Sequence, residues 1–214
     1  MDLHLRRNLQ LFAAALLTIA LVSFIGAWSM AISLPLMILA IPVMLLVVAT
    51  CTLVLLVQGI IIGLTEQSLR DRLIKFGTTP VLLAISIMLA WPALYGGSLL
   101  GTHVRLLINL ASYRQIIAEA RTGALEPGIY HTSENDIDYI VDNGPPVRVA
   151  FNPDGLLDNW SGIIFDPTGI VMSAKGFHPV TGAFYAPERV TKLFGGDLVS
   201  CHSLWGDFYH CSFT

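Results

Sequence analysis

Long apolar runs separated by short polar segments dominate the first half of this chain. Residues 8–65 contain no Asp, Glu, Lys, Arg or His, and residues 76–102 are uncharged as well. A helix needs roughly 20 apolar residues to cross a ~30 Å hydrocarbon core. The pattern therefore predicts three transmembrane helices, at about residues 11–31, 36–62 and 80–100.

The first apolar run also fits a cleaved signal peptide. Arg6 and Arg7 would form its basic region, and Ser29-Met30-Ala31 has the small-x-small pattern of a cleavage site. The run is long for a signal peptide, which favours a membrane helix. Cleavage would leave the topology of the later segments unchanged.

Basic residues beside the spans predict the orientation. Arg6 and Arg7 precede the first span, and the predicted loop at residues 65–79 carries Arg70, Arg72 and Lys75. Because positive charge favours the cytoplasmic side, we expect the N-terminus and this loop in the cytoplasm, and residues 102–214 outside it. Three basic residues after the third span weigh against this orientation: Arg105, Arg114 and Arg121.

Composition changes sharply near residue 101. Residues 102–214 contain seven Lys/Arg and twelve Asp/Glu, a net charge of −5, and enough residues for one modest core. We predict two domains, a transmembrane anchor at 1–101 and an extracytoplasmic domain at 102–214. The acidic domain shows no basic patch of the kind that nucleic-acid binding needs.

The second domain reads as α+β. An apolar stripe at helical spacing predicts a helix at 103–121. Short β-like runs then alternate with turn signals, which predicts a mainly antiparallel sheet. The expected strands are 138–142, 147–151, 162–165, 170–173, 198–204 and 208–213, with a short helix near 187–194.

Two segments of this domain resemble short, uncharacterised bacterial inner-membrane proteins. They are residues 158–169 (DNWSGIIFDPTG) and residues 193–198 (LFGGDL). The resemblance covers roughly the last third of the chain. It implies a bacterial inner-membrane setting and implies no activity.

Two cysteines lie symmetrically about Gly206 in the last predicted hairpin. If the chain turns through Trp205-Gly206-Asp207, Cys201 and Cys211 stand opposite each other at near-disulfide distance. A two-residue turn through Gly206-Asp207 would instead put them on opposite faces. The symmetry and the predicted outer location favour a disulfide.

His202 and His210 share this symmetry and are expected on the other face of the hairpin. That placement argues against a Cys₂His₂ zinc site, since four ligands must converge on one ion. A two-histidine metal site completed by a carboxylate stays open, as do two histidines that only titrate. An acidic segment near His131 is a weaker candidate for a hard cation such as Ca²⁺, with ligands from Glu134, Asp136, Asp138 and Asp142.

Small residues four apart mark possible helix contacts in the membrane half. Gly59 and Gly63 form one pair, and Gly97 and Gly101 form another. Such pairs allow close helix approach, within one chain or between copies of a homo-oligomer.

No catalytic motif and no cofactor motif occurs in the sequence. We therefore expect a non-catalytic membrane protein of the bacterial inner membrane, whose periplasmic domain contacts a protein partner of the envelope. Two alternatives stay open. One is a periplasmic metal-assisted hydrolase that uses the two histidines, and the other is a sensor or immunity-type protein that binds one ligand.

Overall fold

The computed structural model describes residues 3–65, 68–133, 136–142, 144–156 and 159–214. The chain divides into two compact units, Met1–Thr102 and His103–Thr214. Helices α1 (Leu3–Trp28) and α2 (Met30–Thr65) belong to the first unit, and helix α3 (Leu69–Arg121) begins in the first unit and ends in the second. The predicted boundary, between residues 101 and 102, falls one residue earlier.

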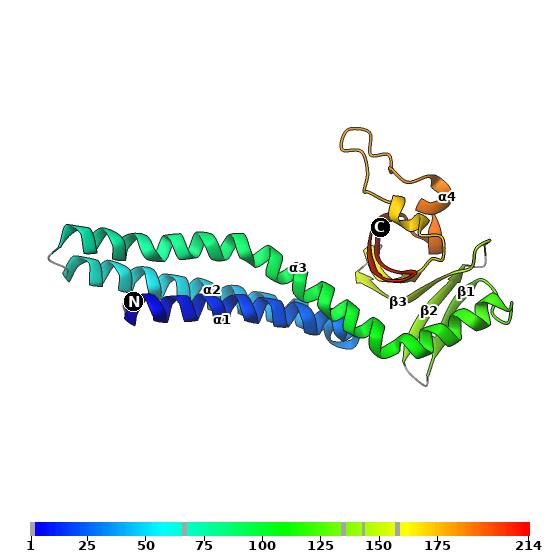
Figure 1. Cartoon of the computed structure of the whole chain (residues 1–214), viewed down its shortest axis with the longest axis horizontal. Coiled ribbons are helices and arrows are strands. Elements are labelled where there is room, and N and C mark those ends of the chain that lie inside the picture. Colours follow the sequence, from blue (N-terminus) through cyan, green and yellow to red (C-terminus); the bar gives the residue numbers. More distant parts are fainter. Residues whose placement is uncertain (1–2, 66–67, 134–135, 143, 157–158) are drawn as a thin grey trace. The chain divides into compact units, whose positions relative to one another are not determined.

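The first unit consists of long apolar helices that run side by side (Figure 1). Within the described residues, two helical stretches are long and apolar enough to cross a membrane, Asn8–Trp28 and Phe76–Arg121. Val48–Ile61 in α2 is a shorter apolar helical stretch.

The predicted loop at residues 65–79 is wrong for residues 69–79, and residues 66–67 lie outside the described residues. Helix α3 starts at Leu69, so Arg70, Arg72 and Lys75 belong to its first turns. Leu, Arg and Lys are good helix formers. The helix therefore includes polar residues before the apolar segment, because helical backbone hydrogen bonds form with polar and apolar side chains alike. The helix predicted at 103–121 is the last part of α3.

Glycines let α3 approach α1 closely within this unit. A Cβ on Gly97 would lie 2.9 Å from the carbonyl carbon of Ala20, and closer still to its oxygen. A Cβ on Gly101 would meet the Phe24 carbonyl oxygen and the Ala27 side chain. The predicted Gly97/Gly101 pair thus serves a helix contact inside one chain. The Ser23 hydroxyl adds a hydrogen bond to the Leu94 carbonyl oxygen at 2.6 Å.

The other predicted glycine pair lies in α2. Gly59 is buried, and a Cβ on Gly63 would collide with the ring of Phe76 in α3. A ring edge can shift more easily than backbone. We therefore expect Gly63 to constrain packing less than Gly97 does.

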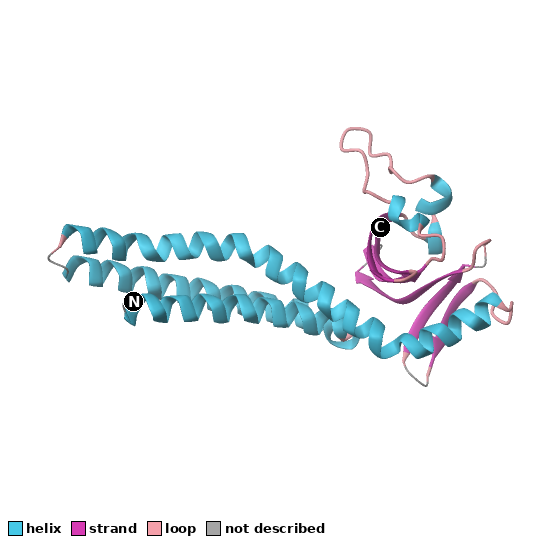
Figure 2. Cartoon of the chain, viewed as in Figure 1, coloured by secondary structure: helices cyan, strands magenta, loops and turns pink. Residues whose placement is uncertain are grey.

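The second unit holds one six-stranded antiparallel sheet in the order β1-β2-β3-β4-β6-β5 (Figure 2). The α+β prediction with a mainly antiparallel sheet therefore holds for this part of the chain. The strands are β1 (Gly128–Thr132), β2 (Ile137–Asp142), β3 (Arg148–Leu156), β4 (Asn159–Phe165), β5 (Leu198–Trp205) and β6 (Phe208–Phe213).

Both faces of this sheet are covered, because buried residues alternate along the central strands. Val149, Phe151 and Ile163 belong to a core with the second part of α3. Ala150 and Ile164 belong to a second core with the segment between β4 and β5. The unit therefore has three layers, with helix α3 on one face and irregular chain on the other.

Tyr113 anchors α3 on the sheet. Its side chain is fully buried and stacks on Phe151, with ring centroids 4.1 Å apart. The Asn152 side-chain amide donates to the Tyr113 hydroxyl at 3.0 Å, which satisfies the one polar atom of the ring. Burial raises the pKa of Tyr113 to about 12, so the hydroxyl stays protonated.

Residues 170–173 do not form the predicted strand. They form the 3-10 helix η1 (Ile170–Ser173), because the buried Asp166 carboxylate accepts a hydrogen bond from the Val171 N–H at 3.1 Å and turns the chain. The sixth strand is instead β1, which was not predicted. The short helix expected near 187–194 is present as α4 (Glu188–Thr191), followed by the 3-10 helix η2 (Leu193–Gly195).

The resembling segments have structural roles in this unit. Trp160 stacks on Phe213, with centroids 3.8 Å apart, and Gly196 lies so close that its Cβ would come within 3.0 Å of the Trp160 Nε1. The two segments therefore meet around one aromatic stack. Asp158, the first residue of the longer segment, lies outside the described residues.

The close contact between α1 and α3 gives a matched test. We expect Gly97→Ala to destabilise the first unit by about 1–3 kcal/mol, the usual cost of overpacking. Gly96→Ala is the control, since nothing lies within 4 Å of the Cβ it would add. Thermal unfolding in detergent, followed by circular dichroism, measures both. Equal midpoints for the two variants would contradict the packing described here.

Candidate functional site

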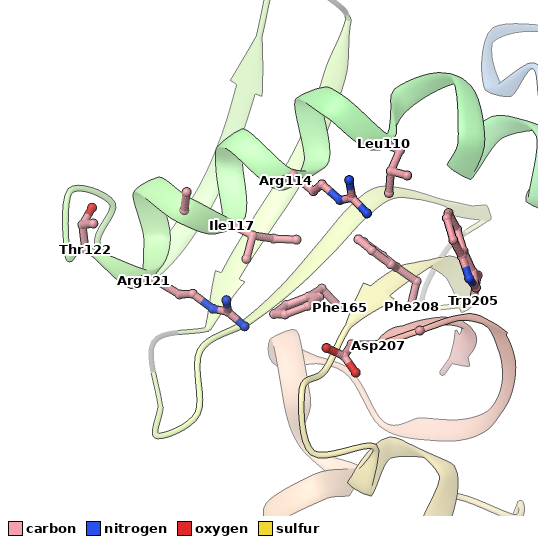
Figure 3. Close-up of a pocket in the computed structure, with 11 residues that line it drawn as sticks. Leu110, Arg114, Ile117, Arg121, Thr122, Phe165, Trp205, Asp207 and Phe208 are labelled. Atoms are coloured by element: carbon pink, nitrogen blue, oxygen red, sulfur yellow. The ribbon is translucent and has the colours of Figure 1, made fainter.

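A groove lies between α3 and the turn of the β5–β6 hairpin, entirely within the second unit (Figure 3). Its volume of about 730 Å³ is in the range of ligand sites. We name it the α3–hairpin groove. It is lined by Leu110, Arg114, Ile117, Ala118, Arg121, Thr122, Phe165, Trp205, Gly206, Asp207 and Phe208.

Two arginines from one flank of α3 form the basic wall. Arg114 and Arg121 are seven residues apart, and Figure 3 shows both guanidinium groups on the side of the helix that faces Phe165 and Phe208. The Arg121 guanidinium carbon lies 5.1 Å from the centre of the Phe165 ring, a cation–π geometry. This contact holds the Arg121 guanidinium over the Phe165 ring.

The floor of the groove is aromatic and belongs to the helix-side core. Phe165 and Phe208 are 5% and 7% exposed, and their ring centroids are 5.6 Å apart. Phe208 also approaches Tyr113, at 6.4 Å between centroids. Because these rings are held by the core, the floor is a preformed apolar surface.

The opposite wall is the hairpin turn. Trp205 is 55% exposed, which is unusual for so large an apolar side chain, and Asp207 lines the groove from the same turn. Trp205 pairs with Phe208, so the turn consists of Gly206 and Asp207, with Gly206 at a φ of 57°. Glycine tolerates this left-handed conformation without steric cost.

Asp166 ties this turn to the end of β4. Its backbone N–H donates to the Asp207 carbonyl oxygen at 3.0 Å. Its carboxylate is fully buried and accepts hydrogen bonds from Arg148 Nε at 3.0 Å, from the Thr168 hydroxyl at 2.7 Å and from the Val171 N–H at 3.1 Å. One buried carboxylate therefore organises the loop that follows the groove residue Phe165.

The environment of Asp166 also determines its charge. Burial would raise the pKa of the carboxyl, but the hydrogen bonds from Thr168 and Val171 and the Arg148 charge outweigh burial and lower that pKa below its ordinary value. Asp166 is therefore ionised under ordinary conditions, and its negative charge is neutralised by Arg148 rather than directed into the groove.

The predicted cysteines lie on the same hairpin. Cys201 and Cys211 are paired across the strands and joined by a disulfide with an S–S distance of 2.01 Å. The turn consists of two residues, the arrangement expected to put the cysteines on opposite faces, yet Cys201 and Cys211 are directly paired. A bulge between Ser203 and Trp205 adds one residue to β5 and restores the symmetric pairing.

The predicted histidines are cross-strand neighbours in this register. His202 pairs with His210. Burial, the Arg105 charge and the adjacent His202 lower the pKa of the His210 imidazole to about 4, so His210 is neutral near pH 7. Among the described residues, no group of three or more His, Cys, Asp or Glu side chains could hold a metal ion.

The acidic segment near His131 forms local contacts. The His131 Nδ1 lies 2.9 Å from the Asp138 carboxylate, and both side chains are mostly exposed. Glu134 lies outside the described residues. This segment and the α3–hairpin groove share no residue.

The sequence contained a signal for the groove that the prediction did not use. Arg114 and Arg121 are seven residues apart, nearly two helical turns, which places them on one flank of the predicted helix. Without the fold, these two arginines indicate only positive charge beside the membrane. The other wall could not be found in this way, because the sequence does not show which turn approaches that flank.

Comparisons with known proteins do not assign a function to the α3–hairpin groove. No family model, curated protein or solved structure matches this chain. The resemblance to bacterial inner-membrane proteins therefore stays a prediction, and the function has to be argued from the site itself.

We expect Asp166→Asn to destabilise the second unit by about 3–5 kcal/mol, because it removes one partner of a buried ion pair. The new amide would also place a donor near the Thr168 or Val171 donors. Asp138→Asn is the control, since that side chain is 63% exposed, and its effect should stay within about 0.5 kcal/mol. Thermal unfolding of the full chain in detergent compares the two.

The pH dependence of this effect has a defined sign. A carboxyl whose folded-state pKa is lowered stabilises the fold fully above its unfolded pKa, about 3.9, and loses that contribution as pH falls through the folded-state value. The gap between wild type and Asp166→Asn should therefore be largest above about pH 4 and shrink in stronger acid. Equal destabilisation by both asparagine variants would contradict the role given to Asp166.

Proposed function

We propose that this chain is an integral protein of the bacterial inner membrane that presents its second unit outside the cytoplasm, where the α3–hairpin groove docks another protein of the envelope. The observation that carries the proposal is the groove itself. It combines a preformed aromatic floor, two arginines and a half-exposed tryptophan. Exposed Trp and Arg beside buried aromatic residues are typical of the centres of protein interfaces.

The membrane part of the proposal has three spans. Two of them correspond to Asn8–Trp28 and to the apolar part of α3, and α2 with its apolar stretch Val48–Ile61 supplies the third. Arg6 and Arg7 precede the first span, and three basic residues lie in the first turns of α3. The positive-inside rule then favours a cytoplasmic N-terminus and an outer second unit.

The disulfide supports the outer location. Bonds of this kind persist mainly in oxidising compartments such as the bacterial periplasm. The bridge joins β5 to β6, which are the two strands that the groove's turn connects. A reducing cytoplasm would remove this link from the hairpin that forms one wall of the docking site.

Interaction, rather than catalysis, suits the residues that line the groove. They include one carboxylate, Asp207, and no histidine or cysteine. The walls offer charge, hydrogen bonding and apolar contact, which are the components of recognition. The metal-assisted hydrolase would use His202 and His210, neither of which lines the groove.

Site-specific photocrosslinking in intact cells tests the docking site. We expect a benzophenone side chain in place of Trp205 to give a discrete protein adduct. The same substitution at Ile129 should give none, although that residue is 80% exposed, because β1 is the opposite edge strand of the sheet. Arg121→Glu should reduce the Trp205 adduct about tenfold, the effect of about 1.4 kcal/mol.

Two outcomes would contradict the proposal. One is the same adduct from both positions, which would indicate random collision at the surface. The other is an adduct at position 205 that neither Arg114→Glu nor Arg121→Glu reduces. Lys175→Glu serves as the charge-matched control, since this exposed lysine makes no contribution to the lining of the groove.

A further inference from the structure

The spacing of the two arginines limits what the α3–hairpin groove can bind. Arg114 and Arg121 are seven residues apart on a continuous helix, which separates their Cα atoms by about 10 Å along its axis. Ile117 and Ala118 lie between them on the same wall. The groove therefore offers two positive charges at separate places, with apolar surface between them.

Two basic residues of the second unit, Arg114 and Arg121, line the groove, whereas the exposed Lys175 lies outside it. Arg148 and Lys192 form ion pairs with Asp166 and Asp197, and Arg105 is buried. Arg114 and Arg121 are exposed in the groove instead. In a domain with a net charge of −5, they form a local basic surface that favours an anionic ligand.

The two sides of the groove favour a peptide over a lipid headgroup. Figure 3 shows the guanidinium groups of Arg114 and Arg121 apart from each other, so each is placed to bind its own anionic group rather than to share one phosphate. Asp207 on the hairpin wall can accept hydrogen bonds from peptide N–H groups, which a phosphate lacks. A ligand with separated carboxylates and backbone donors matches both walls.

The geometry of an extended chain then sets the spacing of those carboxylates. In a polyproline II conformation, residues i and i+3 share one face and lie about 9 Å apart. Carboxylates at these positions would reach both arginines. The residues between them would lie over Ile117 and Phe208, with Trp205 available to cover them.

We propose that the α3–hairpin groove binds an extended acidic peptide segment of its partner, with two carboxylate side chains about three residues apart and an aliphatic or aromatic side chain between them. This inference rests on the proposed function, because it takes the groove to be the docking site for a protein. Arg114 and Arg121 each bind one carboxylate. The aromatic floor and Trp205 bind the apolar side chain.

Selection from a library of random peptides tests the inference on the full chain in detergent micelles. We expect the selected sequences to share two acidic residues about three positions apart with an apolar residue between them. A synthetic peptide of the selected sequence should lose about tenfold in affinity or more when both acids become amides. Higher salt should weaken its binding, because exposed charge pairs are screened.

Variants of the chain complete the test. Arg114→Glu and Arg121→Glu should each lower the affinity about tenfold or more, while Lys175→Glu should leave it unchanged. Arg114→Gln and Arg121→Gln provide second variants that remove charge without reversing it. Thermal unfolding of each variant separates a loss of binding from a loss of folding.

Three results would overturn the inference. They are selected peptides without the acidic pair, peptides that bind the glutamate variants as well as wild type, and no peptide binding while dodecyl phosphate binds with the same arginine dependence. The last result would assign the groove to an anionic lipid. If the crosslink at position 205 fails but the peptide selection succeeds, the result contradicts docking of an envelope protein. It would still support the peptide specificity proposed for the groove.

Discussion

Asp166 has no exposed surface, and its carboxylate accepts hydrogen bonds from Arg148, Thr168 and Val171. Several features of the second unit depend on this cluster. It bends the chain into η1 and so begins the layer that covers one face of the sheet. The Asp166 N–H also holds the hairpin turn through Asp207. A buried charge is stable only when paired and hydrogen-bonded, so the network has to form as a whole.

Much of the fold follows from patterns that the sequence shows directly. Apolar runs predicted the helices of the first unit. Short β-like runs separated by turn residues predicted β2, β3, β4, β5 and β6. The errors arise where a local contact outweighs the pattern. Ile170 and Val171 are β-branched residues that favour a strand, but the Asp166 carboxylate accepts a hydrogen bond from the Val171 N–H and makes a helical turn. A buried side chain's partner cannot be read from spacing along the chain.

The candidate site was predictable only in part. Symmetry placed Cys201 opposite Cys211 in the predicted register, and a β-bulge achieves that register with a shorter turn than the one expected. The groove needs tertiary information, because its walls come from α3 and from a turn more than eighty residues later in the chain. Arg114 and Arg121 were visible in the sequence, but the hairpin turn that lines the groove with them was not.

The account depends most on the side of the membrane where the second unit lies, since both the disulfide and an envelope partner require the outer side. One added cysteine at a time, in a Cys51→Ala background that keeps Cys201 and Cys211, tests this in spheroplasts with an impermeant maleimide. The account predicts that Val180→Cys, at a position 86% exposed, is labelled directly. Ser68→Cys should react only after permeabilisation, and Cys201 and Cys211 only after reduction. Labelling of Ser68→Cys but not Val180→Cys in closed spheroplasts would contradict it.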